Sequence, residues 1–467
     1  MRPGTPWWLE EALQAESRPD ASPPLVGKHE CDVLIVGGGY TGLWAALTLK
    51  QRDPSLSVLL IESAIVGAGP SGRNGGFVHG YWEQLPALVN NFGRDRAMEI
   101  AHLGSQAQQA IMSFIRSSAD DVWLRTAGIM MSATSVAQEA TVDRVLQNSA
   151  ATGTSDLISA LDVDAVHAIC NSPTFRRGVY FSEAATVQPA RLARALRRAV
   201  LATGVRIYEG TRAQQIDSDP VHRVRTPLGT ITCRDVVLAT NSALTTDAVA
   251  RRHVTNLSSY IVLTEPIPDR LAELGWTGGE GIRDARMFLH YMRTTADGRI
   301  AFGTGAGPIA FAGRPGGSLS NETTVRRLQS EFRRLFPALA TVDFTHAWAG
   351  PIDMMSDHLP TFATKPGTRV HYACGFSGHG VNASWIAGQT LASLVQDADD
   401  TWTSSPFCRR TIPHLPPEPF RYLGGHGIKA AILRTEDDGD AGATPPLWAR
   451  IGADLPERFG LRIGTRR

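Results

Sequence analysis

The fold of this chain is decided by the stretch Val33-Leu34-Ile35-Val36-Gly37-Gly38-Gly39-Tyr40-Thr41-Gly42. Four successive apolar residues predict a strand buried on both faces, and the glycines after them fit the pattern G-x-G-x-x-G. In that pattern Gly37 makes the tight turn, Gly39 admits a pyrophosphate to the backbone, and Gly42 lets the strand and the following helix touch. We therefore expect Gly37, Gly39, Tyr40, Thr41 and Gly42 to contact a dinucleotide.

The residues after this turn complete a βαβ unit. Residues 41–50 predict an apolar helix, and residues 58–61 predict a second buried strand. Glu62 and Ser63 follow that strand, where a carboxylate accepts hydrogen bonds from the ribose hydroxyls of a bound cofactor. The pattern therefore predicts a doubly wound α/β domain whose dinucleotide carries no ribose 2′-phosphate.

Two further glycine-rich loops carry groups that suit a flavin nucleotide. The first reads Ser71-Gly72-Arg73-Asn74-Gly75-Gly76 and offers a guanidinium, an amide and several backbone N–H groups to a pyrophosphate or a flavin edge. The second reads Gly375-Phe376-Ser377-Gly378-His379-Gly380, and the helix expected after it directs its positive end at the loop. Either loop alone could be a plain turn. Because the chain also has a dinucleotide-binding fold, we expect both loops to contact FAD. The expected contacts of the second loop are Gly375, Ser377, Gly378, His379 and Gly380.

A third glycine-rich stretch, Gly303-Thr304-Gly305-Ala306-Gly307-Pro308, only superficially resembles a phosphate loop. Pro308 stands where the third glycine belongs, and residues 309–315 offer no helix whose N-terminus faces a phosphate. We interpret this stretch as a loop. Without a second nucleotide motif, the sequence favours an enzyme whose electrons come from the substrate rather than from NAD(P)H.

Composition narrows the possible partners. The 467 residues include 46 basic and 45 acidic side chains, a formal net charge of +1. This balance, without a basic tract, argues against nucleic acid or a membrane surface as a partner. The widely spaced cysteines predict reduced thiols, with no disulfide framework and no metal site. The sequence shows no segment of signal-peptide type, so we expect a cytoplasmic protein, and its oligomeric state stays open.

The chain is long enough for two connected domains. We expect residues 1–30, which show no sustained apolar period, to form an N-terminal arm laid over the body of the protein, with regular structure beginning at Cys31. Residues 31–86, 184–246 and 346–400 form the predicted FAD-binding domain, and residues 87–183 and 247–345 form a substrate domain with an antiparallel sheet. Residues 401–467 form a proline-rich, charged extension in which we find no functional motif.

The chain resembles the D-amino-acid oxidase/glycine oxidase/sarcosine oxidase family of FAD-dependent oxidoreductases, most of all its γ-glutamylputrescine oxidoreductase-like branch. The resemblance runs from about residue 7 to residue 394. It rests on the three loops at 37–42, 71–76 and 375–380 and on Leu-Ala-Thr-Asn-Ser (238–242), Tyr-Ile-Val-Leu-Thr-Glu-Pro (260–266) and Asp-Gly-Arg-Ile-Ala-Phe-Gly (297–303).

The resemblance implies a glutathione-reductase-like Rossmann variant and an α+β substrate domain. It also implies hydride transfer from the C–H beside a substrate amine to flavin N5, giving an imine that hydrolyses to a carbonyl. On the family pattern Ala213 meets the adenine through its backbone, and Thr240 closes over the pyrophosphate side.

Departures from the family pattern concern the substrate. Family members that oxidise small amino acids hold the carboxylate with an Arg where this chain has Ile352, and the sarcosine oxidases use a Lys where it has Asn382. These differences favour an amine over an α-amino acid. Those oxidases also attach the flavin through a Cys, which the stretch around Ala349 lacks, so we expect non-covalent FAD. Residues 251–350 contain no Lys to promote the reaction with oxygen, which leaves O2 or another acceptor open.

The candidates for the substrate pocket are Tyr81, Trp82, His290, Tyr291, Arg293, Trp348 and Asp353, each of which could instead be a packing or ion-paired residue. Neighbours in a strand point to opposite faces, so at most one of His290 and Tyr291 faces the flavin.

The leading hypothesis is oxidation of a primary or secondary amine that carries a polar or anionic group away from the reacting carbon. One alternative is an amino-acid oxidase with Arg293 as its carboxylate anchor. A tRNA-modifying flavoenzyme, which the neutral charge disfavours, and a non-enzymatic flavin sensor are alternatives of other classes.

Overall fold

The computed structural model describes residues 2–4, 6–16, 22–218, 221–314 and 319–458. The rest of the predicted arm and of the predicted extension lies outside the described residues. Two large sheets organise the chain, one of eight strands and one of nine.

The eight-stranded sheet contains the glycine turn. Its strands are β2 (Gly27–Val36), β3 (Val58–Ile61), β9 (Arg206–Tyr208), β10 (Gln215–Ser218), β11 (His222–Arg225), β12 (Gly229–Leu238), β18 (Thr361–Thr364) and β19 (Val370–Cys374). The neighbours in the order β19, β12, β2, β3, β9 pair in parallel. Because β2 is buried at Val33–Val36 and parallel strands need helices over their faces, the apolar run predicts this placement.

Helices cover this sheet near the turn. They are α2 (Tyr40–Arg52), α7 (Pro189–Ala202) and α10 (Gly380–Val395), and α2 packs against the other two. The strand predicted at residues 58–61 has the same bounds as β3. The expected doubly wound α/β fold is confirmed.

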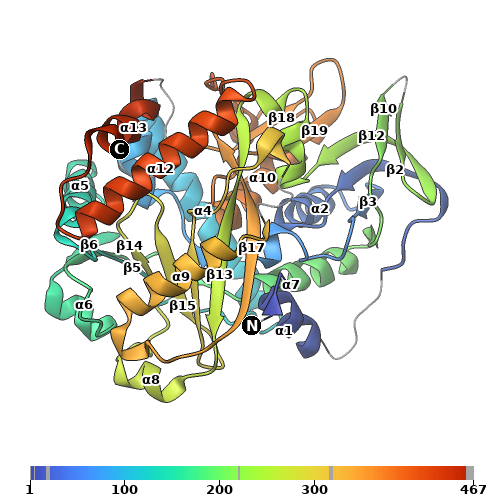
Figure 1. The fold of residues 1–467 in the computed structure, drawn as a ribbon. Helices are drawn as coiled ribbons and strands as arrows, with labels where there is room; N and C mark the ends of the chain where they lie inside the picture. The colour runs from blue at the N-terminus through green and yellow to red at the C-terminus, as the bar shows by residue number, and fades with distance from the viewer. Residues whose placement is uncertain (1, 5, 17–21, 219–220, 315–318, 459–467) are drawn as a thin grey trace.

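The nine-stranded sheet is mostly antiparallel, as expected for the second domain. Its strands are β1 (Arg2–Pro3), β5 (Ile129–Ser132), β6 (Ile158–Leu161), β7 (Gly178–Phe181), β13 (Val254–Thr264), β14 (Gly281–Asp284), β15 (His290–Thr294), β16 (Ile300–Thr304) and β17 (Phe344–Met355). Only the pairs β1·β17 and β14·β5 are parallel. A two-stranded sheet joins β4 (Phe77–Val78) to β8 (Ala185–Thr186). Figure 1 shows β2, β3 and β12 on one side of the molecule and β5, β6 and β14 on the other.

The remaining helices are α1 (Trp7–Ala15), α3 (Leu85–Phe92), α4 (Arg94–Ser117), α5 (Val136–Thr152), α6 (Val163–Ile169), α8 (Pro268–Glu273), α9 (Glu322–Leu335), α11 (Thr401–Ser404), α12 (Phe420–Asp440) and α13 (Leu447–Arg458). In the ranges that the structure describes, no helix combines the length and the apolarity needed to cross a bilayer.

The N-terminal segment differs from the irregular arm that we expected. It forms α1, in which Trp8 and Ala12 are buried and the ring of Trp8 lies 6.0 Å from that of Trp348. The β2 strand also begins at Gly27 rather than Cys31. The expectation was wrong because tertiary packing of the tryptophans, rather than a sustained apolar period, holds α1.

The sheets also bear on the predicted domain limits. β17 pairs with β13 up to Met355, so residues 346–355 are hydrogen-bonded in the nine-stranded sheet although the sequence placed them in the FAD-binding domain. The long shared ladder carries the chain from one sheet to the other. The domain limits as a whole stay a prediction.

Candidate active site

A cavity of about 1480 Å³ lies where the two sheets meet. Ligand pockets for small molecules usually measure about 300–1,000 Å³, so this cavity has room for a dinucleotide and a substrate together. Its wall contains residues of the three glycine-rich loops, of the nine-stranded sheet and of the C-terminal helices α12 and α13.

The first loop places its glycines in three different roles. Gly37 has φ of 115° and its N–H donates to Ile61 O at 2.8 Å, which makes the turn after β2. A Cβ on Gly42 would lie 2.0 Å from Gly37 O, so only glycine lets α2 approach the turn. A Cβ on Gly39 would meet only the Ser71 hydroxyl, at 2.9 Å, and Gly39 lines the cavity at the N-terminus of α2. This bare helix N-terminus is suited to a pyrophosphate.

Glu62 lies opposite this turn at the end of β3. Its Oε2 accepts the Gly38 N–H at 2.8 Å, and its Oε1 accepts the Ala64 N–H at 2.9 Å and the Ser63 hydroxyl at 3.0 Å. Glu62 and Ser63 both line the cavity. The carboxylate therefore lies where the sequence expects the cofactor ribose.

The second loop is fixed against the first. Ser71 Oγ accepts the Tyr40 N–H at 2.9 Å, and Asn74 Oδ1 accepts the Gly76 N–H at 2.7 Å. Arg73 donates to Ala68 O at 2.8 Å and to Ala349 O at 3.1 Å, so its guanidinium joins the segment before this loop to β17 of the nine-stranded sheet. The loop residues on the cavity wall are Ser71, Arg73, Asn74 and Gly75, and Gly72 and Gly76 lie behind them.

The third loop is held by Asp353, one of the candidates for the substrate pocket. Its carboxylate accepts the N–H groups of Gly375 at 2.7 Å and Phe376 at 3.2 Å and the Asn241 amide at 2.9 Å. Burial raises the pKa of Asp353 to about 7 against the lowering effect of these donors. Asp353 therefore shapes the loop that begins α10.

Several residues on the cavity wall retain capacity for a ligand. Ser377, Gly378, His379 and Gly380 line the cavity, as do Ala213 and Thr240. Asn241 Oδ1, beside Thr240, is buried without a hydrogen-bond partner among the described residues. The size of the cavity, the bare turn, the Glu62 carboxylate and this unpaired amide oxygen fit a flavin dinucleotide.

Comparisons with known proteins agree with this geometry. The sequence profile of the DAO family, described as FAD dependent oxidoreductase, matches residues 32–394. The chain belongs to the DAO family. It is therefore an FAD-dependent oxidoreductase, as the sequence predicts.

Among its relatives, gamma-glutamylputrescine oxidoreductase of Escherichia coli is 27% identical over 390 residues, which cover 83% of this chain and 87% of that protein. A probable oxidoreductase, OrdL of Rhizobium meliloti, is 29% identical over 402 residues, covering 84% of this chain and 89% of the relative. The crystal structure of glycine oxidase from Geobacillus kaustophilus superposes with a TM-score of 0.66 at 20% identity, covering 82% of this chain and all of that one (100%). This likeness confirms the expected fold.

The nine-stranded sheet supplies another part of the cavity wall. Tyr291 lines the cavity, and its hydroxyl lies 2.7 Å from Ser259 Oγ, which donates to Thr304 O at 2.9 Å. His290 points to the other face, where its Nδ1 lies 2.7 Å from Asp284 Oδ2. Tyr291 thus lines the cavity and His290 does not, which is the opposite-face arrangement of strand neighbours.

The structure places the other candidates for the substrate pocket away from the cavity wall. Arg293 is buried under the ring of Trp8 and donates to Val187 O, and Trp348 donates to Arg73 O at 2.9 Å. Tyr81 is buried beside the rings of His379 and Phe407. Trp82 donates to Glu183 at 2.9 Å. Arg293 therefore cannot anchor a substrate carboxylate without leaving its burial site.

A charged cluster on the cavity wall was missed by the sequence reasoning. Glu83 Oε2 lies 3.0 Å from Arg283, and its Oε1 lies 3.2 Å from both His79 and His379. Although burial raises the pKa of Glu83, the charges of Arg283 and His79 and the hydrogen bonds of the two histidines hold it well below its usual range. His79 and Glu83 are four residues apart, the one local signal of this cluster, and Arg283 comes from a distant strand.

The C-terminal extension, in which we found no functional motif, also forms part of the cavity wall. Arg421, Gly425, Ile428 and Lys429 of α12 and Trp448 of α13 line the cavity. The segment lacks a sequence motif because its contribution depends on where long-range contacts place it.

Proposed function

We propose that this DAO-family protein oxidises a primary or secondary amine with non-covalently bound FAD. The observation that carries the proposal is the position of Ile352, which lines the cavity. An apolar side chain there offers no charge to the carboxylate of an α-amino acid. The E. coli relative is named for an amine, γ-glutamylputrescine, which supports the same class of substrate.

FAD, when bound, would supply the hydride acceptor for oxidation of the carbon beside the amine nitrogen, and the imine so formed would hydrolyse to a carbonyl. The protein supplies orientation and a water-poor wall for this step. Burial raises the pKa of Tyr291 to about 12, so its phenol keeps its proton at neutral pH and acts as a hydrogen-bond donor. We infer that Tyr291 and Ser259 position the substrate rather than take its proton.

Non-covalent binding is supported by the positions of the cysteines. Cys31, Cys170, Cys233, Cys374 and Cys408 are all free thiols, and none of them belongs to the cavity wall of the described chain. Acid precipitation is expected to release the whole flavin into the supernatant. Yellow colour retained in the precipitate would contradict this part of the proposal.

The proposed reaction is tested by its products. The FAD-loaded protein, incubated in air with a primary amine, should form one carbonyl, trapped as a hydrazone, for each ammonium released. Carbonyl formation from D- or L-amino acids at higher kcat/KM than from every amine in the panel would contradict the proposal.

One observation favours amino acids as a second class of substrate. Arg283 lines the cavity, is 6% exposed, and its Nε and Nη1 are buried without partners although its Nη2 pairs with Glu83. These N–H groups could hold a carboxylate, a role that we assigned to Arg293 from the sequence. Oxidation of an α-amino acid that is abolished in Arg283→Met and kept in Arg293→Met would favour this alternative.

A further inference from the structure

The helix α12 lies outside the span of the family profile, which ends at residue 394, and yet it forms part of the cavity wall. Figure 1 shows it as the long red helix on the face of the molecule that also carries α5. The part of the cavity that α12 covers is thus specific to chains with such an extension.

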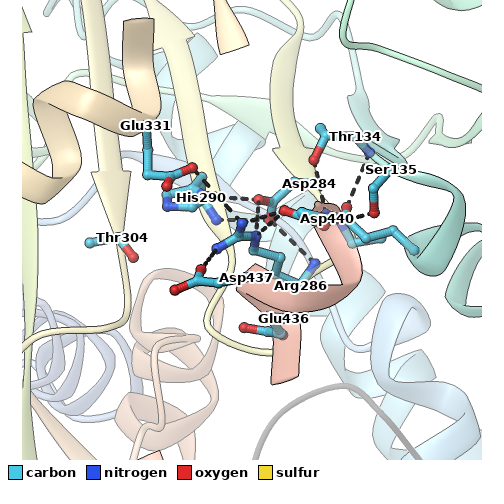
Figure 2. Close-up of polar contacts among 12 residues, drawn as sticks. Thr134, Ser135, Asp284, Arg286, His290, Thr304, Glu331, Glu436, Asp437 and Asp440 are labelled. Carbon is cyan, nitrogen blue, oxygen red and sulfur yellow. Dashed lines mark hydrogen bonds and ion pairs between the residues drawn. The ribbon is translucent and has the colours of Figure 1, made fainter. Parts of the chain in front are cut away.

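Buried ion pairs hold the C-terminal end of α12. Figure 2 shows Arg286 between two carboxylates of α12, Asp437 and Asp440, with its Nη1 3.2 Å from Asp437 and its Nε 2.9 Å from Asp440. Asp440 also accepts from Ser135 at 2.7 Å and from Gln138 at 2.9 Å. The side chains of Arg286 and Asp440 are 2% and 8% exposed, so water screens this pair little, whereas the Asp437 side chain is 40% exposed.

Apolar contacts hold the middle of α12. Ile432 is buried and packs with Leu257 and Phe288 of the nine-stranded-sheet domain, and Ile428 and Ile309 join the same cluster. Because i and i+4 positions share one face of a helix, Ile428 and Ile432 fix which face of α12 turns toward the sheet. Lys429 follows Ile428 and reaches the cavity beside this contact.

Lys429 is a cation without an anionic partner. It is half-buried, its Nζ donates to Gly307 O at 2.7 Å, and no carboxylate of the described chain lies within ion-pair distance of it. Burial and the nearby Arg327 lower the pKa of Lys429 to about 8, which leaves it charged at neutral pH. A cation that pays for burial without a counter-ion is unusual in a structural role.

The carboxylates on the cavity wall are all engaged elsewhere. Glu62 and Asp353 accept backbone N–H groups, Glu83 pairs with Arg283, and Asp357 pairs with Arg410 at 2.7 Å. None of them neutralises Lys429. The wall formed by α12 therefore presents net positive charge to whatever enters the cavity.

The distance between Lys429 and the Ser259–Tyr291 pair can be bounded from the chain between Thr304 and Gly307. Ser259 Oγ bonds Tyr291 and Thr304 O, and Gly307 follows Thr304 by three residues. An extended chain covers at most about 3.6 Å per residue, so Gly307 lies within about 11 Å of Thr304. A substrate of several carbons can span this separation.

We propose that Lys429 forms a subsite for an anionic group of the substrate, a carboxylate several bonds from the amine that is oxidised. The proposal rests on the proposed amine oxidation and adds the class of amine. According to this proposal α12 determines substrate specificity, and the ion pairs of Arg286 hold α12 so that Lys429 stays at the cavity.

The test compares monosuccinyl-putrescine, which ends in a carboxylate, with monobutyryl-putrescine, which ends in a methyl group. A charged hydrogen bond to a carboxylate is worth about tenfold to 100-fold in binding. Lys429→Met should lower kcat/KM for the succinyl amine by that factor and change it less than about twofold for the butyryl amine. Lys429→Arg should recover most of the loss.

The matched control is Arg434→Met, which removes a cation from the same helix. Arg434 is 56% exposed and pairs with Asp438, away from the cavity. This variant should keep the wild-type preference for the succinyl amine. An equal loss for both amines in Lys429→Met, or the same loss in Arg434→Met, would overturn the subsite.

Binding measured by calorimetry separates this proposal from the proposed function. If neither amine is oxidised, the function fails, and the subsite stands only if monosuccinyl-putrescine binds the FAD-loaded protein at least tenfold more tightly than it binds Lys429→Met. Equal binding to both proteins would overturn the subsite whether or not turnover occurs.

Discussion

Substitutions at two glycines of the first loop should affect folding and cofactor binding differently. In Gly39→Ala the new Cβ lies 2.9 Å from Ser71 Oγ, and Ser71 can turn away at the loss of its hydrogen bond from the Tyr40 N–H. That loss costs about 1 kcal/mol. Gly39 has φ of −80° and ψ of −179°, which alanine also adopts, so the substitution returns about 0.4–1 kcal/mol through the unfolded chain.

The cost of the lost hydrogen bond and the gain through the unfolded chain nearly cancel. The free energy of unfolding of cofactor-free Gly39→Ala, measured in urea, should therefore lie within about 1 kcal/mol of the wild-type value. FAD should bind at least about tenfold more weakly, because the methyl group stands where the pyrophosphate approaches. Fluorescence quenching of FAD measures the second quantity.

Gly42→Ala is the matched substitution with the opposite expectation. Its Cβ would lie 2.0 Å from the backbone oxygen of Gly37, which cannot move without opening the turn. We expect a loss of about 3 kcal/mol or more in the free energy of unfolding. Wild-type FAD affinity in Gly39→Ala would refute the role of Gly39, and equal destabilisation by the two substitutions would refute their division of roles.

Three further predictions concern other parts of the site. In Glu62→Gln an amide N–H₂ faces either the Gly38 or the Ala64 N–H, a mismatch of two donors that costs about 1–3 kcal/mol. FAD binding, measured by titration, should weaken by about tenfold or more. Unchanged affinity would contradict the role of Glu62 at the ribose. Arg286→Met removes the guanidinium that pairs with Asp440 and so weakens the attachment of α12. Trypsin should then cut α12 at least about tenfold faster than in the wild type. Equal cutting rates would contradict the role of Arg286 in holding α12. Because the pKa of Lys429 is about 8, its charge is present below that pH and is lost above it. The KM for monosuccinyl-putrescine should therefore rise above pH 8 in the wild type and stay flat in Lys429→Met; parallel profiles would contradict the assignment.

The sequence predicts those features that neighbouring residues determine. The turn at Gly37, the βαβ unit and the bounds of β3 follow from runs of apolar residues and from glycines that the backbone geometry requires. The opposite faces of His290 and Tyr291 follow from strand geometry alone. For these features, local patterns carry enough information.

The rest depends on contacts between distant segments. Nothing near Arg283 or Arg293 tells which of them reaches the cavity, because Glu83 lies 200 residues before the first and Val187 accepts from the second. The position of α12 is likewise set by Arg286, which lies 154 residues before Asp440. Pairs of residues this far apart in the sequence cannot be predicted from local patterns, because their contacts depend on how the two sheets pack.

Anaerobic reduction of the bound flavin tests the central claim most directly. The FAD-loaded protein is mixed without oxygen with single amines and single amino acids, and the visible flavin band is followed. We predict that amines bleach the band, monosuccinyl-putrescine faster than monobutyryl-putrescine, and that α-amino acids leave it unchanged. A flavin that no amine bleaches, or that α-amino acids alone bleach, would contradict the assignment of this protein as an amine-oxidising flavoenzyme.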